Sequence, residues 1–355
     1  MKTVFRPWGK LLLAWAIVLV FGTGAAAEDA IKLKVSHQPE FESFLTWQAI
    51  KDGTGKKYNL DMEMVYFDSG MLQVEALPAK QWDVGALGAV PMVMAALRYG
   101  SYMIGMTHDD AFNVFIMARP NSDVLKVKGA NRDYPNMYGT AESVRGKTIL
   151  ATTVSAGHYV LSTWLKRLGL KDSDVKIMNM EQGQAVAAFE SGKGDIVALW
   201  APFTMSGLSK GWKKVANGED CGATVPLVII TSKEYGDKYP DRVAKYLKMY
   251  FAQVDRQIKE KQSQAKEYQR FLKEWAGIEL NDQMISMDID LHPMYTLERN
   301  LKVFDASGGP SQAYKWMDSL STFFTDNKRF TEEERGKVMK TPFITDKFLK
   351  QAAAK

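Results

Sequence analysis

The segment "WDVGALGAVP", residues 82–91, returns in a related form later in the chain as "GDIVALWAP", residues 194–202. Each copy places an Asp before a short run of small or β-forming apolar residues, and each copy ends in Pro. Short apolar runs bounded by Gly and Pro are typical of buried strands. We therefore interpret the two segments as equivalent strands in two related halves of the chain.

The spacing around these segments indicates an internal repeat. The distance from Gly70 to Asp83 is 13 positions, and that from Gly183 to Asp195 is 12. Because Gly and Asp mark turns in many proteins, one such helix–turn–strand unit would carry little information. Two units in nearly the same register favour a duplicated element and predict two lobes of similar build.

Alternation of apolar and polar residues predicts the strands, and helical spacing predicts the segments between them. In the first half we expect strands at 31–37, 60–67 and 82–88, with helices at 44–55, 68–80 and 91–100. In the second half we expect strands at 147–153, 175–180 and 195–200, with helices at 157–170 and 183–194. Strands that alternate with helices indicate an α/β fold with a parallel sheet in each lobe.

Two extended segments, 113–118 and 225–231, are interpreted as the places where the chain crosses between the lobes. These two crossings would form a hinge. The first lobe would then contain residues 28–117 and 227–355, and the second lobe residues 118–226. From Pro240 onward apolar residues recur every three or four positions, which predicts a helical C-terminal region in the first lobe.

The first 27 residues have the pattern of a secretory signal peptide. Lys2, Arg6 and Lys10 precede an apolar run of 11 residues, and small residues up to Ala27 form a cleavage site. A membrane anchor is the alternative, but 11 apolar residues are well short of the roughly 20 that span a bilayer. We expect cleavage after Ala27 and a mature protein outside the cytoplasm; the periplasm is implied only by the family resemblance described below.

Charge gives no reason to expect a nucleic acid as partner. The chain has 46 Lys and Arg against 41 Asp and Glu, a net charge of +5. Removing the three cations of the signal peptide leaves 43 against 41, or +2. A nearly balanced surface does not attract a polyanion. The single cysteine, Cys221, permits no intramolecular disulfide and is interpreted as a small buried apolar residue.

Catalytic and metal-binding signatures are missing from the sequence. It contains no G-x-S-x-G, H-E-x-x-H, C-x-x-C or Walker motif. The four His residues show no metal-ligand spacing. Asp109 and Asp110 would suit a metal pair, but adjacent acids ahead of a strand are more simply turn formers. We expect no catalytic residue, no metal and no cofactor.

The segments that follow the predicted strands are the candidate binding site, because ligands of open parallel sheets bind beyond the carboxyl ends of the strands. Three of these segments lead directly into predicted helices, whose N-termini offer unpaired N–H donors to an anion. Ser69 and Ser155 would add hydroxyl donors, and Gly70, Gly88 and Gly157 would allow close backbone approach. For each Ser alone, helix capping is the more common role.

The motifs "FDSG", "LGAVP", "TVSAGHY" and "WAPF", with twin lobes and a signal peptide, resemble the periplasmic substrate-binding proteins of taurine, sulfonate and nitrate ABC importers. The taurine-binding type is the most similar. The resemblance implies a two-lobed periplasmic binding protein fold of type II, which closes on a small organic anion and delivers it to a membrane permease. It also implies a monomer. The ligand-binding positions would be Gln38, Glu40, Phe41, Ser69, Gly70, Gly88, Ala89, Val90, Ser155, Gly157, His158, Trp200 and Pro202.

One position departs from the taurine-binding pattern. Relatives of that type often carry an acid beside the Trp and Pro of the last motif, where this chain has Ala201. Either Glu40 supplies the missing charge or the ligand has no amine. Two other functions stay open: a related-fold enzyme of pyrimidine or thiamine-precursor metabolism, and a receptor that reports its ligand to a membrane sensor. The enzymes rely on His- and Cys-rich motifs that this chain lacks.

Overall fold

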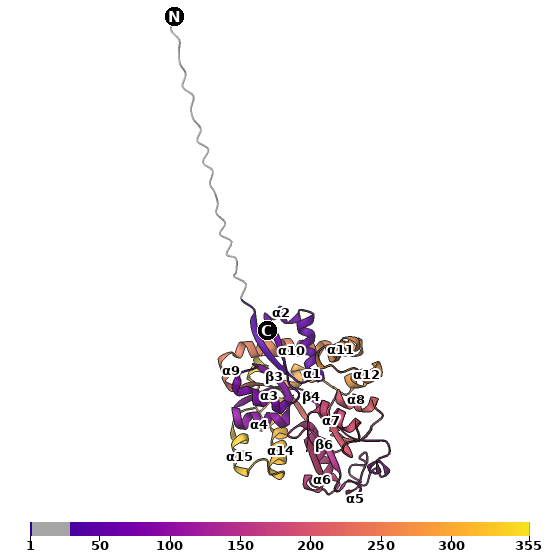
Figure 1. Ribbon diagram of the computed structural model, residues 1–355. Helices are drawn as coiled ribbons and strands as arrows, with labels where there is room; N and C mark the ends of the chain where they lie inside the picture. The colour runs from indigo at the N-terminus through magenta and orange to yellow at the C-terminus, as the bar shows by residue number, and fades with distance from the viewer. Residues whose placement is uncertain (2–28, 355) are drawn as a thin grey trace.

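The computed structural model describes Met1 and residues 29–354. The predicted signal peptide and its cleavage site fall outside this described part. The chain forms two α/β lobes, upper and lower in Figure 1, each built around a five-stranded sheet. Across residues 29–354, none of the helices combines the length and the hydropathy that a membrane-spanning segment needs.

The sheet of the first lobe contains strands from both ends of the chain. Its strand order is β2-β1-β3-β10-β4. Strand β1 is parallel to β2 and β3, whereas β10 is antiparallel to its two neighbours, β3 and β4. The strands are β1 (Ile31–His37), β2 (Leu60–Tyr66), β3 (Val84–Gly88), β4 (Ser101–Asp109) and β10 (Pro226–Ser232).

The sheet of the second lobe repeats this arrangement, with the order β7-β6-β8-β5-β9. Strand β6 is parallel to β7 and β8, and β5 is antiparallel to β8 and β9. The strands are β5 (Phe115–Ala118), β6 (Thr148–Ala151), β7 (Lys176–Asn179), β8 (Ile196–Leu199) and β9 (Lys213–Asn217).

The strands formed by the two related segments, residues 82–91 and 194–202, occupy equivalent places. Each of β3 and β8 is the third strand of its sheet and lies beside the antiparallel strand formed by a crossing segment. The two-lobed α/β fold is therefore confirmed, and the predicted parallel pairs are present, but each sheet also contains antiparallel pairs. The crossing segments enter the sheets instead of spanning the space between them, which makes both sheets mixed.

Strands β4 and β9 were not predicted. Strand β4 is buried along nearly its whole length, so its sequence has none of the alternation that marks a half-exposed strand. The predicted lobe boundary at residue 118 runs through β5, whose first three residues also pair within the second sheet. The assignment of residues 28–117 and 227–355 to one lobe, and of 118–226 to the other, stays a proposal.

Helices cover both sheets. Those of the first repeat are α1 (Phe41–Lys51), α2 (Thr54–Lys57), α3 (Gly70–Ala76) and α4 (Ala89–Tyr99). Those of the second are α5 (Ala141–Val144), α6 (Ala156–Arg167), α7 (Gln182–Glu190) and α8 (Phe203–Ser209). Capping explains several starts: Ser155 accepts a hydrogen bond from the backbone N–H of His158 at the start of α6, as expected of an N-cap serine.

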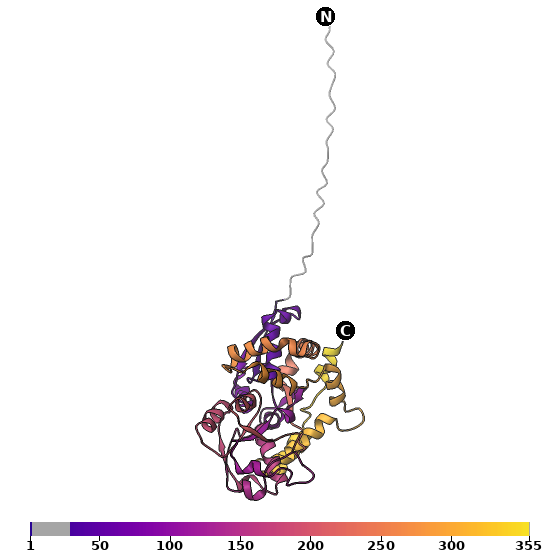
Figure 2. The same cartoon turned by 90° about the vertical axis from the view of Figure 1, so that its right-hand side faces the viewer.

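The C-terminal region is helical, as predicted, and packs on the first lobe. Helix α10 contacts α1 and α16, and its buried face belongs to the same core as the first sheet. Two of these helices also contact the second lobe: α12 contacts α8, and in α14 the ring of Phe323 lies edge-to-face against Tyr159 of α6, at 5.0 Å. Figure 2 shows these helices, in orange and yellow, along the outside of the molecule. They are α9 (Lys233–Lys238), α10 (Pro240–Glu260), α11 (Ala265–Phe271), α12 (Asp282–Asp290), α13 (Leu297–Phe304), α14 (Gln312–Asp326), α15 (Glu332–Lys340) and α16 (Lys347–Ala353).

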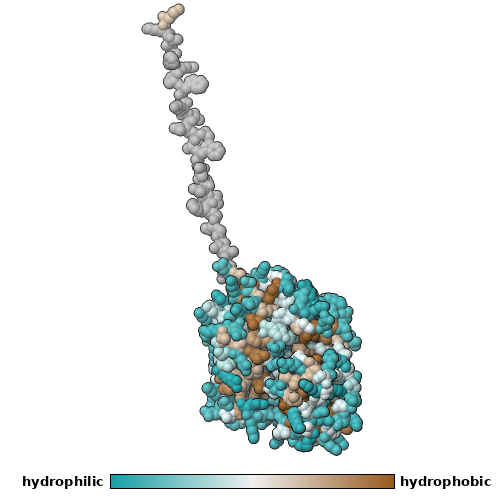
Figure 3. Space-filling view, viewed as in Figure 1, coloured by the Kyte–Doolittle hydropathy of each residue, from teal (hydrophilic) through white to brown (hydrophobic). Residues whose placement is uncertain are grey.

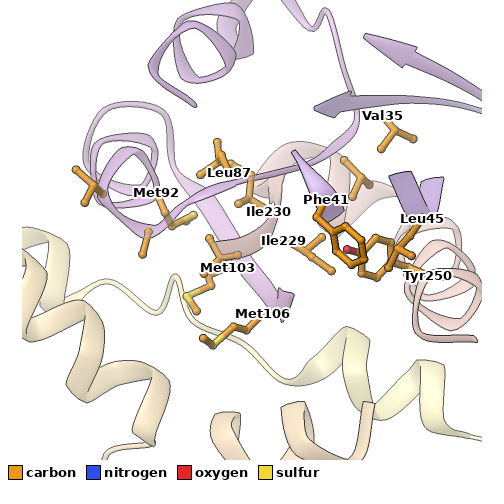
Figure 4. Packing of buried hydrophobic residues seen from close by; sticks show 14 of the residues in the cluster. Val35, Phe41, Leu45, Leu87, Met92, Met103, Met106, Ile229, Ile230 and Tyr250 are labelled. Atoms are coloured by element: carbon orange, nitrogen blue, oxygen red, sulfur yellow. The ribbon is translucent and has the colours of Figure 1, made fainter. Parts of the chain in front are cut away.

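The core of the first lobe lies on both faces of its sheet, because successive residues of a strand point to opposite faces. In β10, Ile229 lies near Phe41 and Ile230 lies near Leu87 (Figure 4). Both isoleucines are fully buried. Outside the core, Figure 3 shows a face that is mostly hydrophilic, with apolar residues in small groups. Burial of β10 on both faces therefore ties the C-terminal part of the chain to the N-terminal strands.

We expect Ile229→Ala to lower the free energy of unfolding by about 2–5 kcal/mol, because it leaves a cavity in a core that has no exposed side to relax into. Urea unfolding followed by circular dichroism measures the change. Ile258→Ala is the matched control: that side chain is 49% exposed, and its loss should change stability by only about 0.5 kcal/mol or less. Equal effects of the two substitutions would contradict this description of the core.

Candidate ligand-binding site

A small cavity lies where segments of the two lobes meet. Its volume is about 20 Å³, enough for about one water molecule. The lining residues come from the ends of strands in both sheets and from the helices that follow them. They are Gln38, Glu40, Gly70, Gly88, Pro91 and Asp110 from the first lobe and Ser155, Ala156 and Trp200 from the second.

Six of the residues that the sequence analysis proposed as ligand-binding line this cavity: Gln38, Glu40, Gly70, Gly88, Ser155 and Trp200. Each lies at or just beyond the carboxyl end of a strand, where the ligand rule for parallel sheets placed it. Seven further candidates do not line the cavity, namely Phe41, Ser69, Ala89, Val90, Gly157, His158 and Pro202. Their assignment to the site stays a proposal, and three of them have other contacts that are specific enough to describe.

Phe41 belongs to the core. Its side chain is fully buried and its ring packs on Tyr268 and His292, with 4.9 Å between ring centres in both cases. His158 is held by Asp172, whose Oδ2 is 2.9 Å from the His Nε2. Ser69 donates a long hydrogen bond, 3.4 Å, to Glu181 Oε1 of the second lobe. Ser69 and Glu181 thus form a direct contact between the lobes beside the cavity.

Helix N-termini converge on the cavity. Helix α4 begins directly after Gly88, α6 directly after Ser155, and α1 directly after Glu40. The first N–H groups of a helix have no partner within it and carry partial positive charge, so each start favours an anionic group nearby. We expect the backbone of Ala156 and Gly157 to be the donors at α6.

Ser155 itself is a helix cap and not a free donor. Its hydroxyl donates to the carbonyl oxygen of Thr152 at 2.6 Å and accepts from the backbone N–H of His158 at 3.2 Å. The predicted hydroxyl contact from Ser155 to an anion would require the bond to Thr152 to break. Capping, the common role of such a serine, accounts for this residue in the structure.

The lobes approach each other closely at Gly88. A Cβ atom built on this residue would lie 3.6 Å from Pro91 Cδ and 3.9 Å from Ala156 Cβ of the second lobe. At Gly70 a Cβ atom would meet Pro91 Cγ at only 2.6 Å. Gly70 is therefore required by packing within the first lobe, whereas Gly88 leaves room at the boundary between lobes.

Trp200 closes the cavity from the second lobe. It is 3% exposed, and its backbone N–H donates to Gln182 Oε1 at 3.1 Å. Its indole Nε1 is buried and has no hydrogen-bond partner among the described residues. An indole N–H is a donor only, and burying one without a partner is unfavourable. This atom is therefore available to an acceptor on a ligand.

Two carboxyl groups face the cavity from the first lobe. Glu40 and Asp110 are 5% and 4% exposed. Burial raises the pKa of Glu40 well above its usual value, and the charges of Glu42, Asp110 and Asp288 raise it further. Asp110 Oδ1 accepts hydrogen bonds from His108 Nε2 at 2.8 Å and from Asn113 Nδ2 at 2.9 Å. The lining residues include no Lys or Arg.

Asp110 was interpreted from sequence as a turn former. That role belongs to its neighbour Asp109, which accepts hydrogen bonds from the backbone N–H groups of Ala111 and Val225. Asp110 directly follows β4, the strand that the sequence analysis missed. Recognising β4 would have identified Asp110 by the same rule that identified the other lining residues.

Behind the cavity a chain of buried polar groups continues from Asp110. Asn113 Nδ2 lies 3.2 Å from His292 Nε2, and His292 Nδ1 lies 2.6 Å from the backbone oxygen of Asp288. The carboxyl group of Asp288 accepts a hydrogen bond from the hydroxyl of Tyr268 at 2.7 Å. Burial, partly offset by this hydrogen bond, raises the pKa of Asp288 to about 7. Within residues 29–354, no group of three or more His, Cys, Asp or Glu side chains is placed to hold a metal ion.

The two-lobed architecture is that of the periplasmic binding proteins. The chain superposes with a TM-score of 0.70 on the alkanesulfonate-binding protein SsuA from Xanthomonas axonopodis pv. citri bound to MOPS, covering 90% of this chain and 99% of the other at 18% identity. With the periplasmic nitrate-binding protein NrtA from Synechocystis PCC 6803 the TM-score is 0.65, covering 92% and 89% at 15% identity. The predicted fold class is confirmed.

Residues 37–269 match the NMT1-like family, and the chain belongs to this family. It is 31% identical over 231 residues to a protein of Brachyspira hyodysenteriae named as an ABC transporter periplasmic binding protein. It is 28% identical over 226 residues to the taurine-binding periplasmic protein of Escherichia coli. The aligned stretches cover 65% and 62% of this chain, and they span 66% and 64% of the relatives' lengths. The resemblance inferred from the sequence motifs is confirmed.

The buried carboxyl of Asp288 makes a prediction for the pH dependence of stability. Its pKa is near 4 in an unfolded chain and about 7 in the folded protein. Its stabilising contribution to the free energy of unfolding is therefore complete below about pH 4 and is lost as the pH rises through 7. The difference in free energy of unfolding between the wild type and Asp288→Asn should therefore change with pH. Between about pH 4 and pH 7, the wild-type value should fall relative to that of the variant by about 1.4 kcal/mol per pH unit. Chemical unfolding at several pH values measures the difference.

Asp290→Asn serves as the control, because this residue lies on the same helix with a side chain that is 54% exposed. Its pH profile should run parallel to that of the wild type. A parallel profile for Asp288→Asn as well would show that folding does not raise the pKa of Asp288.

Proposed function

We propose that this protein is the substrate-binding component of an ABC importer and that it captures a small sulfonate-type anion between its two lobes. The observation that carries the proposal is a cavity lined from both lobes at which the N-termini of α4 and α6 meet. Membership of the NMT1-like family and the similarity to taurine- and sulfonate-binding proteins support it. The protein would bind and release its ligand unchanged, without enzymatic turnover.

Capture requires movement of the lobes. A cavity of about 20 Å³ does not admit a sulfonate, whose head group alone has four heavy atoms. The lobes would separate about the two crossings that lead into β5 and β10, admit the ligand and close on it. A ligand that contacts both lobes favours the closed state, because only that state offers all of its contacts. The contact of Ser69 with Glu181 would form and break in each cycle.

Delivery completes the proposal. The protein would act in the periplasm after removal of its signal peptide, as a monomer, and would pass its ligand to a membrane permease. Similarity to proteins named as periplasmic binding proteins supports this location and partner. Loss of ligand uptake in a strain lacking the gene, restored by the gene on a plasmid, would separate transport from a role as a receptor for a membrane sensor.

Binding is tested by a thermal-shift screen of the purified protein with sulfonates, carboxylates, nitrate and pyrimidines. A ligand at 100 times its dissociation constant should add about 2.7 kcal/mol to stability. The amount of ligand recovered after prolonged incubation measures turnover. A screen in which no anion stabilises the protein, or in which a stabilising ligand is consumed, would contradict the proposed function.

We expect Gly88→Ala to weaken binding of any ligand found in this screen by roughly tenfold or more, because the added methyl group enters the boundary between the lobes. Its nearest neighbours would be at ordinary contact distances, so the fold should be retained. Gly183→Ala is the control: it lies in α7, with no atom within 4 Å of a built Cβ. Titration calorimetry measures both affinities, and unchanged binding by Gly88→Ala would place the site elsewhere.

A further inference from the structure

The cavity between the lobes would bring an anion close to carboxyl groups. Its lining includes Glu40 and Asp110, both of them buried, and it includes no Lys or Arg. An anionic group held at the N-terminus of α6 would face these carboxyl groups across a space of about 20 Å³ in this structure. Like charges at such short range repel strongly when water is excluded. Binding of an anion is therefore favoured by a carboxyl group that has become neutral.

The two carboxyl groups of the lining have different surroundings. Asp110 Oδ1 accepts hydrogen bonds from His108 Nε2 at 2.8 Å and from Asn113 Nδ2 at 2.9 Å, so two donors already engage it as an acceptor. Burial raises the pKa of Glu40 well above its usual value, and neighbouring acids raise it further. These acids are Glu42, Asp110 and Asp288. A proton is therefore kept more easily on Glu40 than on an exposed glutamate.

The other titratable groups around the cavity are engaged in pairs. In the first lobe the pairs are His37 with Glu42, His108 with Asp110, and Tyr268 and His292 with Asp288. Beside the cavity in the second lobe they are His158 with Asp172, and Glu181 with Ser69 of the first lobe. Of all these residues, Asp110 alone lines the cavity. A proton added to the cavity wall is therefore assigned to Glu40.

The second lobe supplies donors to the same cavity. Ser155 and Ala156 bring the N-terminus of α6 to it. The indole Nε1 of Trp200 is a buried donor without a partner among the described residues, and Trp200 lines the cavity as well. A protonated carboxyl group on Glu40 would add an O–H donor from the first lobe. An anion would then receive hydrogen bonds from both lobes, which favours the closed state.

We propose that Glu40 takes up a proton when the anion binds and donates a hydrogen bond to the ligand through that proton. The proton comes from the solvent and returns to it on release, so the ligand leaves unchanged. This inference rests on the proposed function and adds a pH dependence to it, in which acid favours capture and a rising pH favours release. The sign follows from charge, because an anion beside Glu40 makes the loss of its proton less favourable.

The size of the effect follows from linkage. The pKa of Glu40 is higher in the complex than in the empty protein, and binding takes up a proton only between these two pKa values. Uptake of one proton for each ligand bound makes the affinity fall about tenfold per pH unit in that window. Below the window Glu40 is protonated in both states, and the affinity no longer changes with pH.

Ethanesulfonate is the probe that tests the proposal. It stays ionised throughout the pH range used, so a proton taken up on binding is bound by the protein. Titration calorimetry in Bis-Tris and Tris buffers measures its affinity for the wild type at several pH values between about 6 and 9. A pH indicator in unbuffered salt solution measures proton uptake on mixing. We expect the affinity to fall by up to about tenfold per pH unit and the uptake to approach one proton per protein.

Glu40→Gln keeps the size of the side chain and carries a permanent N–H donor. Its affinity should be nearly independent of pH, without proton uptake, and at the highest pH it should exceed that of the wild type by about tenfold or more. Glu63→Gln is the matched control on an exposed position of β2, away from the cavity, and should keep the wild-type profile. Asp110→Asn should keep the uptake but move it to lower pH, because a neighbouring acid is removed.

The outcomes separate this inference from the proposed function. Binding of ethanesulfonate by the wild type without pH dependence or proton uptake would overturn the inference and leave the sulfonate-binding function standing. A pH dependence that survives Glu40→Gln would place the proton on another group, and weaker binding by this variant at every pH would show that the ligand needs a carboxylate acceptor. Either result would overturn the role of Glu40.

Unfolding midpoints show which variants are folded. If Glu40→Gln fails to fold, proton uptake by the wild type and its displacement to lower pH in Asp110→Asn still decide the question, and the absence of either would overturn the inference. If the folded wild type does not bind ethanesulfonate at any pH, the sulfonate-binding function is wrong and the inference falls with it.

Discussion

The pairing of β10 between β3 and β4 is the constraint on which the rest of the structure depends. It joins residues 226–232 to strands formed before residue 110, and β5 holds the corresponding place in the second sheet. Because an interior strand uses hydrogen bonds on both edges, neither sheet is complete until the chain has crossed between lobes. The crossings are therefore anchored in the two sheets, and in the proposed cycle bending would occur in the short segments beside them. This arrangement places the ends of β1, β3, β4, β6 and β8 around one cavity.

A second constraint comes from burying carboxyl groups without cations. Glu40, Glu42, Asp110 and Asp288 are all buried in one region of the first lobe, and burial raises the pKa of Glu40, Glu42 and Asp288. Buried charge that lacks a partner opposes folding. A raised pKa keeps a carboxyl group protonated to a higher pH, which reduces the charge that is buried here. Helix N-termini in the second lobe provide the complementary donors.

Much of the fold follows from the sequence because the repeat and the strand alternation are local signals. Six strands, the two crossing segments and the helical C-terminal region were predicted from them. Strand β4 was not predicted, because burial on both faces removes the alternation of apolar and polar residues. Asp110, which directly follows β4, was therefore not identified as a residue of the cavity. Phe41 was proposed for the site because an aromatic ring would suit an apolar ligand body; in the structure its ring packs in the core, the alternative role of such a side chain. The hydroxyl of Ser155 was proposed as a ligand donor because the segments after the strands were expected to converge on one cleft. Its hydrogen bond to Thr152 was not predicted, because it depends on loop geometry that the sequence does not contain.

Helix α14 has a consequence for the free protein. It packs on α4 of the first lobe, while its Phe323 ring lies against Tyr159 of the second. In the proposed cycle this aromatic contact is lost each time the lobes separate, although it touches neither the cavity nor the ligand. Such pairs contribute about 0.5–1.5 kcal/mol, and 1 kcal/mol changes a two-state ratio about fivefold. The C-terminal helices would thereby influence the fraction of ligand-free protein that is in the open state. The affinity for the ligand would then respond to sequence changes far from the residues that select the ligand.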